Sequence, residues 1–539
     1  MLEKETKTRE KFAPTLPDWL SYLYQPILPL LKKIHIHREG PRGYKPEDIL
    51  LPDGYVAELV ADGLNSPDHC CFDDEGYCYV VESGHKIDEV PRILKVDTQT
   101  GEWETFFTLP EERWIKSGAM TGARWHEGYL YVMNTDSLLR IGPGREMEEI
   151  LGGLAGRGDH PAGPPVIGPD DKIYFGQGCA TNCGVVGADN FGFEWLPKYP
   201  EVCDIPAKDV TLVGRNYKAR NVLDDIRETV ETGAYVPFGT PTSPGQVIKG
   251  NVRCNGSILR CGLDGSNLEV VAWGLRNPFC VAFTSDGRLF ASEHGMDERG
   301  VRYVFDDPDD FYEIKEGEWY GWPDFASGIR LDDPYWGEGG HGREPVLAEF
   351  PNPNPPKPLV SFQTHAAANG FDFCRNPEFG FEGDAFVACF GDLAPITTIK
   401  RAVTPAGFKV VRVDMKSRQI YDFAVNKMTG PASKLPHEGF ERPSHCQFGP
   451  DGALYVVDFG TIRIAPERGG IREQVRTGSL WRIRRTEGPQ GFVPPEPVQV
   501  PLYLLQGLAI AAGVVGIGIA SAWLLKKFRT GRNGNGMNR

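Results

Sequence analysis

Carboxylates gather in one short connection of the chain. A His-Gly-Met-Asp stretch at residues 294–297 leads into four aspartates and ends in Trp-Tyr-Gly-Trp-Pro at residues 319–323. The four aspartates are Asp306, Asp307, Asp309 and Asp310. Carboxylate and backbone carbonyl oxygens crowded into a loop are the ligands that a hard cation such as calcium prefers. On composition alone, the stretch is either a calcium-binding loop or a solvated acidic loop.

The element that precedes this loop is a predicted β-hairpin. Residues 279–283 and 288–292 are two runs of β-forming residues on either side of a Ser-Asp-Gly turn. The same hairpin pattern occurs six times along the chain. The copies lie at residues 67–84, 120–141, 161–178, 277–295, 366–392 and 443–460.

Repeated hairpins at intervals of tens of residues are typical of a β-propeller. A β-sandwich is the alternative all-β fold, but six copies of one hairpin argue against it. The spacing is irregular, which predicts large insertions at about residues 179–250 and 324–364. We expect such insertions to lie over one face of the propeller and to build the functional site there.

Charge and cysteine usage limit the possible partners. The 539-residue chain has a formal net charge of −15, which argues against a nucleic-acid partner because that would need a basic face. None of the twelve cysteines stands in a C-x-x-C-H motif, so covalent attachment of haem c has no support. Cys254 and Cys261 are spaced so that they could pair across a hairpin in an oxidising compartment.

The two ends of the chain differ from the repeats. Residues 1–50 are predicted to be an N-terminal extension without the pattern of a signal peptide. Its apolar part, residues 16–34, is interrupted by prolines and indicates a strap on the propeller or a short helix at a membrane surface. The propeller itself is predicted over residues 51–485, and a Pro-rich linker over residues 486–500.

A transmembrane helix is predicted over residues 501–526. Residues 502–525 carry no charge, and a helix of that length reaches about 36 Å, enough for a bilayer core of about 30 Å. A buried core helix is the alternative. The basic tail at residues 527–539 places the tail in the cytosol and the propeller outside, although a chain without a signal peptide would usually keep its propeller in the cytosol. We expect a single-pass membrane protein with an extracytoplasmic propeller.

Several motifs occur in a recognisable order. Gly-Leu-Arg-Asn-Pro at 274–278 is followed by Ser-Glu-His-Gly at 292–295, an acidic pair at 309–310 and Tyr-Gly-Trp-Pro at 320–323. This ordered string resembles the glucose/sorbosone dehydrogenase family, which are quinoprotein sugar dehydrogenases. The resemblance implies an all-β fold, a six-bladed β-propeller, with pyrroloquinoline quinone (PQQ) and Ca²⁺ as cofactors.

The resemblance also implies site residues. His160, in His-Pro-Ala-Gly-Pro-Pro-Val-Ile-Gly-Pro, matches the histidine that acts as general base while hydride moves to the quinone. Arg276 and Asn277 match the pair beside PQQ, where a guanidinium suits a cofactor that bears carboxylates. Gly295 and Met296 match the positions whose carbonyls hold the calcium ion on the quinone.

Three further positions have two possible roles. Asp309 and Asp310 match the acidic pair and either bind a second, structural calcium ion or cap a strand. His365 resembles a channel residue of the family, which contacts the cofactor or substrate or makes a hydrogen bond in the core.

The chain departs from the family pattern in three places. Cys179 stands where the family has an aspartate that orients the base, and cysteine is a poor acceptor, so we expect weaker activation of His160. Residues 391–395 lack the Gly-Ser-Trp-Asn-Arg of many members, so a cofactor arginine is missing there, and Arg401 or Arg412 could supply its charge. His294 replaces a different polar residue beside the calcium loop.

Three functions fit these observations. The first is a membrane-anchored quinoprotein dehydrogenase that oxidises an aldose or a related alcohol or aldehyde and passes electrons to a cytochrome or a membrane quinone. The second is a non-catalytic propeller that binds a ligand or a protein on the same face. The third is a calcium-dependent hydrolase of the lactonase or esterase kind, but this needs several carboxylates around a central metal, and the sequence gives no clear set.

Overall fold

The computed structural model of the chain describes residues 42–85, 89–336, 343–394, 397–398, 405–465 and 470–486. All of them belong to the first of two compact units, residues 1–495 and 496–539. The predicted apolar strap, transmembrane helix and basic tail lie outside the described residues, as does Arg401. Within the described ranges, no helix has both the length and the apolar character needed to cross a membrane.

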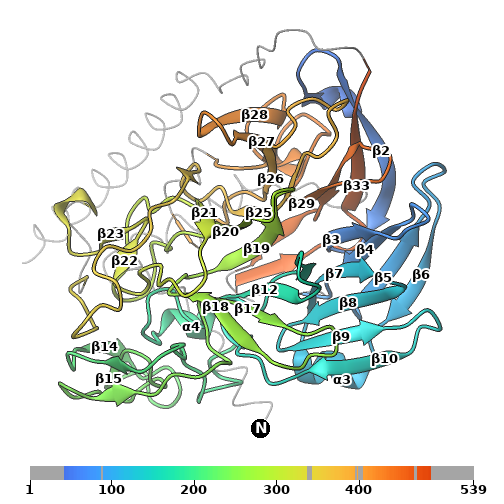
Figure 1. Cartoon of the computed structure of the whole chain (residues 1–539). Coiled ribbons are helices and arrows are strands. Elements are labelled where there is room, and N and C mark those ends of the chain that lie inside the picture. The colour runs from blue at the N-terminus through green and yellow to red at the C-terminus, as the bar shows by residue number, and fades with distance from the viewer. Residues whose placement is uncertain are drawn as a thin grey trace, which may run out of the picture. The chain divides into compact units, whose positions relative to one another are not determined.

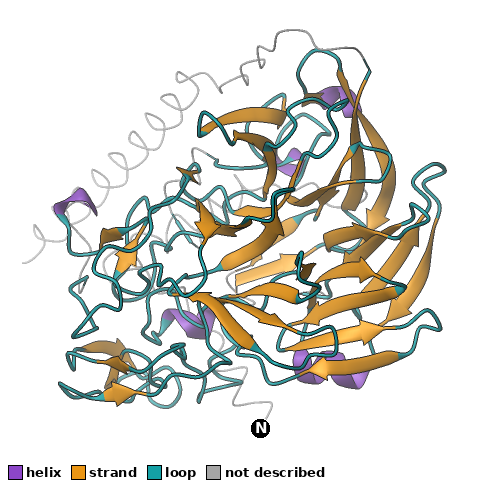
Figure 2. Ribbon diagram, viewed as in Figure 1, coloured by secondary structure: helices purple, strands orange, loops and turns teal. Residues whose placement is uncertain are grey.

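The described residues form six antiparallel sheets in sequence order, each with four or five strands (Figures 1 and 2). The first sheet contains β3 (Pro67–Phe72), β4 (Cys78–Glu82), β5 (Arg92–Val96) and β6 (Trp103–Thr108). The second contains β7 (Met120–His126), β8 (Tyr129–Asn134), β9 (Ser137–Ile141) and β10 (Met147–Leu151). The third contains β11 (Val166–Ile167), β12 (Ile173–Gln177), β17 (Ser257–Cys261) and β18 (Glu269–Trp273).

The other three sheets follow the same plan. The fourth contains β19 (Pro278–Phe283), β20 (Leu289–Glu293), β21 (Asp310–Ile314) and β24 (Val360–Ser361). The fifth contains β25 (Ala368–Phe373), β26 (Ala385–Cys389), β27 (Lys409–Asp414) and β28 (Gln419–Asn426), with β1 (Ile49–Leu50) at its outer edge. The sixth contains β29 (Pro443–Phe448), β30 (Leu454–Asp458), β33 (Gly478–Arg485) and β2 (Tyr55–Leu64).

The inner strands of successive sheets pack side by side in a closed ring. Strand β3 contacts β7, β7 contacts β11, and β12 of the third sheet contacts β19. Strand β19 contacts β25, β25 contacts β29, and β29 contacts β3 again. This is a six-bladed β-propeller, so the fold predicted from the six hairpins is confirmed. Strand β2 comes from the N-terminal side and pairs with β33, the last strand of the chain to be described. The ring is therefore closed by a contact between the two ends of the propeller sequence.

Strands that are covered on both faces are apolar along their whole length. Strand β8 is buried at all but its first residue, and β4 is buried throughout. Of the apolar clusters that the described residues form, six each lie between two neighbouring sheets. The hydrophobic core is thus divided among the blade interfaces, which fixes the spacing of the blades around the ring.

Insertions at one end of the ring carry their own elements. Between β12 and β17 lie α4 (Asp189–Gly192), β13 (Val210–Thr211), β14 (Asn216–Arg220), β15 (Thr229–Gly233) and β16 (Val247–Ile248). Between β21 and β24 lie β22 (Phe325–Ala326), β23 (Ile329–Arg330) and η2 (Pro334–Trp336), and between β30 and β33 lie β31 (Ile462–Ala465) and β32 (Gly470–Glu473). The remaining short helices are η1 (Pro46–Asp48), α3 (Glu111–Ser117) and η4 (Ala432–Lys434).

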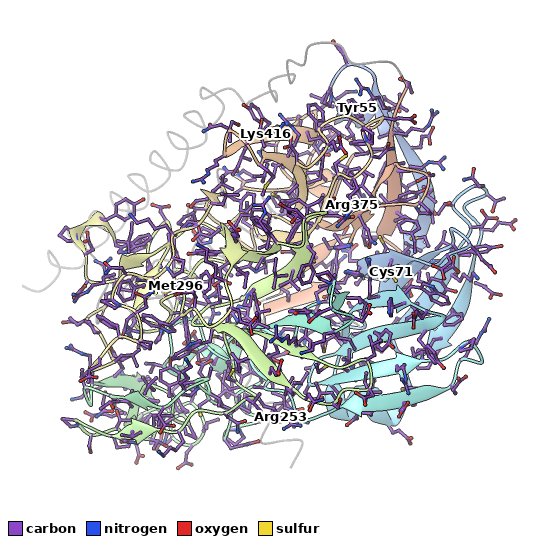
Figure 3. The ribbon with its side chains drawn as sticks, viewed as in Figure 1. Tyr55, Cys71, Arg253, Met296, Arg375 and Lys416 are labelled. Carbon is purple, nitrogen blue, oxygen red and sulfur yellow. The ribbon has the colours of Figure 1, made fainter. Side chains whose placement is uncertain are left out.

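The first two insertions share one apolar core. Val185 and Leu212 from the first pack with Trp322, Phe325 and Leu347 from the second. Figure 1 shows β14, β15, β22 and β23 together at one side of the ring, and Figure 3 labels Met296 there and Cys71 between the first sheets. Packing of the two insertions against each other holds the loop after β20 between them.

The cysteines form no disulfide bonds in the described residues. All twelve cysteines lie in described residues and are free thiols. Cys254 precedes β17 and Cys261 ends the same strand, so the two do not face each other across a hairpin. The spacing of Cys254 and Cys261, which left such a pair possible, therefore does not correspond to a disulfide in this structure.

Candidate active site

His160 is fixed by a backbone carbonyl. Its Nδ1 lies 2.8 Å from the carbonyl oxygen of Cys179, and a carbonyl only accepts, so Nδ1 carries the proton and donates it. The neutral ring then presents Nε2 as an unprotonated nitrogen, and Nε2 has no hydrogen bond to any residue that the structure describes. Gly178 lies directly behind the ring, because a Cβ at that position would clash with His160 and with Asn277.

The surroundings of His160 keep it neutral. Burial has the largest effect, and the positive charges of Arg276 and Arg299 act in the same direction, so the pKa of His160 lies well below its usual value. The Cys179 carbonyl and Asp297 oppose this effect but do not outweigh it. His160 is therefore an unprotonated base at neutral pH.

Cys179 orients the histidine without using its side chain. Its N–H donates to the carbonyl of Arg276 at 2.7 Å while its own carbonyl accepts from His160. The thiol lies in the core, 3.5 Å from the carbonyl of Leu275. The weaker activation of His160 that we expected from this cysteine stays a prediction, and the acceptor that orients the ring is the main-chain carbonyl of Cys179.

Arg276 and Asn277 lie near His160. The buried guanidinium of Arg276 donates from Nη2 to Asp297 at 3.0 Å and from Nε to the carbonyl of Asn182 at 3.3 Å. Its Nη1 donates to the carbonyl of His294 at 3.4 Å. Asn277 Nδ2 is 2.9 Å from Nδ1 of His294. A guanidinium has five N–H groups, so two remain for another partner at this site.

The loop at Gly295 and Met296 is held by aspartates through its N–H groups. Gly295 donates to Oδ1 of Asp309 at 3.0 Å, and Met296 donates to Oδ2 of Asp307 at 2.6 Å. Neither carbonyl of this pair accepts a hydrogen bond from another described residue. Both carbonyls are thus available as ligands for a hard cation.

The two members of the acidic pair have different roles. Asp309 uses both carboxylate oxygens to accept backbone N–H groups, from Gly295 and, at 3.1 Å, from Ala368. Asp310 accepts from the hydroxyls of Ser361 at 2.6 Å and Ser327 at 2.8 Å. Asp309 therefore positions the loop, whereas Asp310 faces a cavity.

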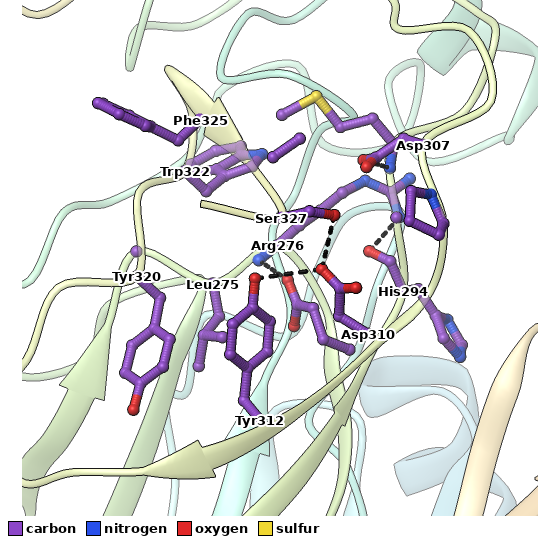
Figure 4. A pocket seen from close by; sticks show the side chains of 16 residues that line it. Leu275, Arg276, His294, Asp307, Asp310, Tyr312, Tyr320, Trp322, Phe325 and Ser327 are labelled. Atoms are coloured by element: carbon purple, nitrogen blue, oxygen red, sulfur yellow. Dashed lines mark hydrogen bonds between the residues drawn. The ribbon is translucent and has the colours of Figure 1, made fainter. Parts of the chain in front are cut away.

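That cavity, of about 30 Å³, lies between β20, β21 and the second insertion (Figure 4). Glu293 and Asp307 line it together with Asp310, and each of the first two has a buried oxygen without a hydrogen-bond partner, Oε2 and Oδ1. The volume admits one ion or one or two water molecules and is far too small for a sugar. Asp307 belongs to the acidic cluster that the sequence offered as a calcium-binding loop, whereas Glu293 was not predicted as a ligand.

Crowding of three carboxyl groups changes their ionisation. Burial is the largest cause and raises the pKa of Glu293 to about 8, of Asp307 to about 8 and of Asp310 to about 7, with the neighbouring aspartates acting in the same direction. A divalent cation would relieve this repulsion and satisfy the unpartnered oxygens. Among the described residues, however, no three or more His, Cys, Asp or Glu side chains are already arranged so that they could hold a metal ion.

His365 lies close to these residues, but Arg412 does not. His365 Nε2 is 3.7 Å from Glu298, and burial is outweighed by Glu298, Asp297 and Asp309, so the pKa of His365 is raised. Arg412 forms an ion pair with Asp384 in the fifth sheet and lies over the ring of Phe381, at 4.1 Å.

Arg412 therefore does not face His160, and the expectation that it replaces a cofactor arginine is corrected. Its guanidinium is used within the sheet, where Asp384 neutralises its charge. The other candidate for this role, Arg401, lies outside the described residues.

The sequence motifs also missed Arg299. Its guanidinium donates to Asp159, Asp189 and Asp297, at 2.6, 2.7 and 3.0 Å. The only sequence signal for this cluster was position, because Asp159 immediately precedes His160 and Arg299 follows the calcium-type loop.

Comparison with solved structures supports the fold. The PQQ domain of a pyranose dehydrogenase from Coprinopsis cinerea matches 83% of this chain and 98% of its own, with a TM-score of 0.51 and 14% identity. A carbohydrate-active enzyme of family AA12 from Trichoderma reesei, described as a calcium structure, matches 83% of this chain and 99% of its own, with the same TM-score and identity.

Sequence comparison gives one relative and one family. Quinoprotein glucose dehydrogenase B from Acinetobacter calcoaceticus is 28% identical over 318 residues, which are 52% of this chain. The match spans only 55% of that relative's length. Residues 245–461, from just before β16 to just beyond β30, match the family described as Glucose / Sorbosone dehydrogenase.

Proposed function

We propose that this protein is a PQQ-dependent sugar dehydrogenase that oxidises an aldose or a related alcohol or aldehyde. The observation that carries the proposal is the geometry of His160. A single hydrogen bond to the Cys179 carbonyl fixes its tautomer, and the unprotonated Nε2 is left without a partner among the described residues. The names of the relatives, which are quinoprotein, pyranose and glucose dehydrogenases, support the same reaction class.

The residues of the site fit the proposed cofactors. Arg276 retains two N–H groups for an anionic or carbonyl oxygen, and the Gly295 and Met296 carbonyls accept no hydrogen bond from other described residues. These residues would hold PQQ and its calcium ion. When bound, PQQ supplies a quinone that accepts a hydride, and calcium acts as a Lewis acid beside it.

The chain's own contribution to the reaction is proton removal. Nε2 of His160 takes the proton of the substrate hydroxyl group while a hydride leaves the carbon that bears this hydroxyl, for the quinone. The hydrogen bond from Nδ1–H to the Cys179 carbonyl keeps the ring in place. The lowered pKa keeps the base unprotonated down to mildly acidic pH and also makes it a weaker base. Gly178 leaves room for the His160 side chain, because a Cβ there would clash with the Cβ of His160 and with Asn277.

Membrane attachment is part of the proposal and is supported by the sequence only. Residues 501–526 would anchor the propeller, and electrons would pass to a cytochrome or a membrane quinone. Separation of membrane and soluble fractions for the full chain and for a chain ending at residue 500 tests this point. The anchor is refuted if the two chains distribute alike.

One experiment tests the dehydrogenase. The full chain in detergent is titrated with PQQ in the presence of calcium, binding is followed by absorbance, and aldose-dependent dye reduction is then measured. We expect saturable binding that is weakened in Arg276→Gln, and turnover that is lost in His160→Gln while binding remains. Arg253→Gln is the control, because Arg253 is an exposed arginine whose side chain donates to the carbonyl of Gly152, away from His160.

The second candidate is a non-catalytic propeller that binds a ligand or a protein. The observation in its favour is that Arg412 is bound to Asp384 and does not supply the charge of the missing cofactor arginine. Failure of PQQ to bind at micromolar concentration would decide for this candidate.

A further inference from the structure

Arg299 holds three carboxylates at once. Its Nη2 lies 2.6 Å from Asp159, its Nη1 lies 2.7 Å from Asp189, and its Nε lies 3.0 Å from Asp297. The side chain is 8% exposed, and its guanidinium lies over the ring of Phe193 at 4.2 Å. Charge-assisted bonds to three partners in a buried place fix the position of every group involved.

The three carboxylates come from three separate parts of the chain. Asp159 immediately precedes His160, Asp189 begins α4 in the insertion after β12, and Asp297 follows the Gly295–Met296 loop. Arg299 therefore ties the segment that carries the base to the insertion and to the loop that would hold the cation.

The Asp159 carboxylate and backbone are fully engaged. Its Oδ1 accepts from the indole of Trp195 at 2.7 Å and from Nδ2 of Asn190 at 3.1 Å, and its N–H donates to the carbonyl of Ala180 at 3.0 Å. The next residue, His160, donates to the neighbouring carbonyl of Cys179. Two hydrogen bonds thus hold residues 159–160 against residues 179–180, and Arg299 binds the Asp159 carboxylate of the same segment.

We infer that Arg299 is the positioning residue for His160, which it holds through Asp159 with Nε2 free to accept a proton. The catalytic consequence of this role rests on the proposed dehydrogenase function, whereas the positioning itself does not. Arg299 does not touch His160 in the contacts of the structure, so it acts through Asp159 and through its charge.

The charge of Arg299 is the second part of its role. The charged groups that act on His160 are Arg276, Arg299 and Asp297, with Asp159 as its neighbour in the chain, while Cys179 acts through its backbone carbonyl. After burial, the two arginines are the largest causes of the lowered pKa of His160. Loss of Arg299 should therefore raise the pKa of His160 toward the ordinary value of about 6.5.

The test measures His160 directly. Diethyl pyrocarbonate reacts with unprotonated imidazole, so its rate of reaction at His160, followed by peptide mass spectrometry across pH, gives the pKa without cofactor or substrate. The full chain is compared with Arg299→Gln, and folding is checked by thermal unfolding. We expect the midpoint in Arg299→Gln to move up by about one pH unit or more, since one pKa unit corresponds to a tenfold change in the protonation equilibrium.

Arg302→Lys is the matched control. Arg302 is equally buried, is paired with Asp324 and donates to the carbonyls of Cys183 and Pro323, but it is not among the groups that face His160. We expect Arg302→Lys to lower the stability of the protein but to leave the pKa of His160 unchanged. An unchanged midpoint in folded Arg299→Gln, or an equal shift in Arg302→Lys, would overturn the inference.

A second variant keeps the inference testable if Arg299→Gln does not fold. Arg299→Lys retains the charge but cannot bind three carboxylates, so we expect an unchanged midpoint and a plateau rate of modification that differs at least threefold from that of the parent. An unchanged plateau rate would also overturn the inference. If the parent protein does not oxidise sugars but the midpoint still shifts in Arg299→Gln, the proposed function is refuted and the positioning role of Arg299 stands.

Discussion

His160 is oriented by the backbone carbonyl oxygen of Cys179 and not by a carboxylate. The main-chain oxygen of Cys179 fixes the tautomer as firmly as a side chain could, because the N–H of the same residue is anchored to Arg276. A carbonyl dipole stabilises an imidazolium less than a negative charge does. The ring is therefore well oriented, but its protonated form has little support.

Replacement of His160 should separate binding from turnover. In His160→Gln, a side-chain nitrogen can still donate to the Cys179 carbonyl, but no strong base remains. We expect kcat/KM for aldose oxidation to fall by roughly 10²–10⁴-fold, the usual contribution of a positioned general base. Steady-state dye reduction measures this fall, and PQQ binding should change little. A loss of less than tenfold would show that His160 is not the base.

At the residue scale, the sequence predicted identities better than partners. His160, Arg276 and Asn277 stand in local motifs, and the structure brings them together. The three ion pairs of Arg299 could not be predicted from the sequence, because its partners lie 2, 110 and 140 residues away from it. Hydrogen bonds between distant segments depend on how the blades close, and no local pattern encodes them.

The loop after β20 combines two functions in one element. Its N–H groups are taken by Asp307 and Asp309, whereas its carbonyls accept no hydrogen bond from other described residues. Behind it, the unpartnered oxygens of Glu293 and Asp307 face a cavity that admits one ion. Calcium at either place would stiffen the connection that carries Arg299 and Asp297.

Calcium should stabilise the protein through this element. A ligand that binds only the folded state at a hundred times its Kd adds about 2.7 kcal/mol, which raises Tm measurably. In Glu293→Gln, Oε1 can still accept the N–H of Arg276, and the parent carboxyl is itself mostly protonated at neutral pH without calcium. We therefore expect a similar Tm without calcium and a smaller calcium-dependent rise.

Thermal unfolding with and without calcium measures both quantities. Glu349→Gln is the control, because Glu349 is exposed, and it should keep the full calcium effect. An equal rise in Glu293→Gln and in the parent protein would show that the cavity holds no cation.

At the element scale, the hairpins could be predicted because they are local. Each one pairs strands separated by a short turn, as in β29 and β30 or β19 and β20. The positions of the insertions could be predicted from the sequence, but their structures could not. Their contacts, such as the bridge between Leu212 and Leu347, join segments that have no repeat pattern.

Closure of the whole ring depends on β2, a strand that lies outside the six hairpin repeats and was not predicted from them. It pairs with β33 over eight residue pairs, and Glu58 accepts from both Arg482 and Arg484 across the two strands. The partners are more than 400 residues apart, so the entropy of closing this loop is recovered only when the other blades are in place. Without β2, β33 would present an unpaired edge.

A single buried side chain on β2 should report this closure. Leu64 is fully buried, so we expect Leu64→Ala to lower the free energy of unfolding by about 2–5 kcal/mol. Asp62 is exposed on the same strand, and Asp62→Ala should change it by no more than about 0.5 kcal/mol. Urea unfolding measures both values. Equal effects of the two substitutions would mean that β2 does not contribute to the core of the sixth sheet.

The seam between the last and first sheets also contains a buried histidine pair. His445 on β29 stacks on His69 on β3 with ring centroids 3.8 Å apart, and Arg124, Asp372 and Gln447 are their charged and polar neighbours. Burial is the main cause that lowers the pKa of His445 to about 4, while Asp372 opposes it and Arg124 adds to it. The pKa of His69 is also well below its usual value, because of burial and the neighbouring His445.

Acid should therefore open the ring at this seam. A histidine with a lowered folded-state pKa binds its proton more readily when unfolded, so its contribution to stability is complete above about pH 6.5 and is lost as the pH falls toward 4. The shift of His445 corresponds to about 3 kcal/mol over that interval. We expect His445→Gln to flatten the fall in Tm between pH 6.5 and 4, whereas His126→Gln at the half-buried end of β7 should leave it steep. If His445→Gln is as acid-sensitive as the parent protein, carboxylates elsewhere in the ring, and not this seam, govern its stability in acid.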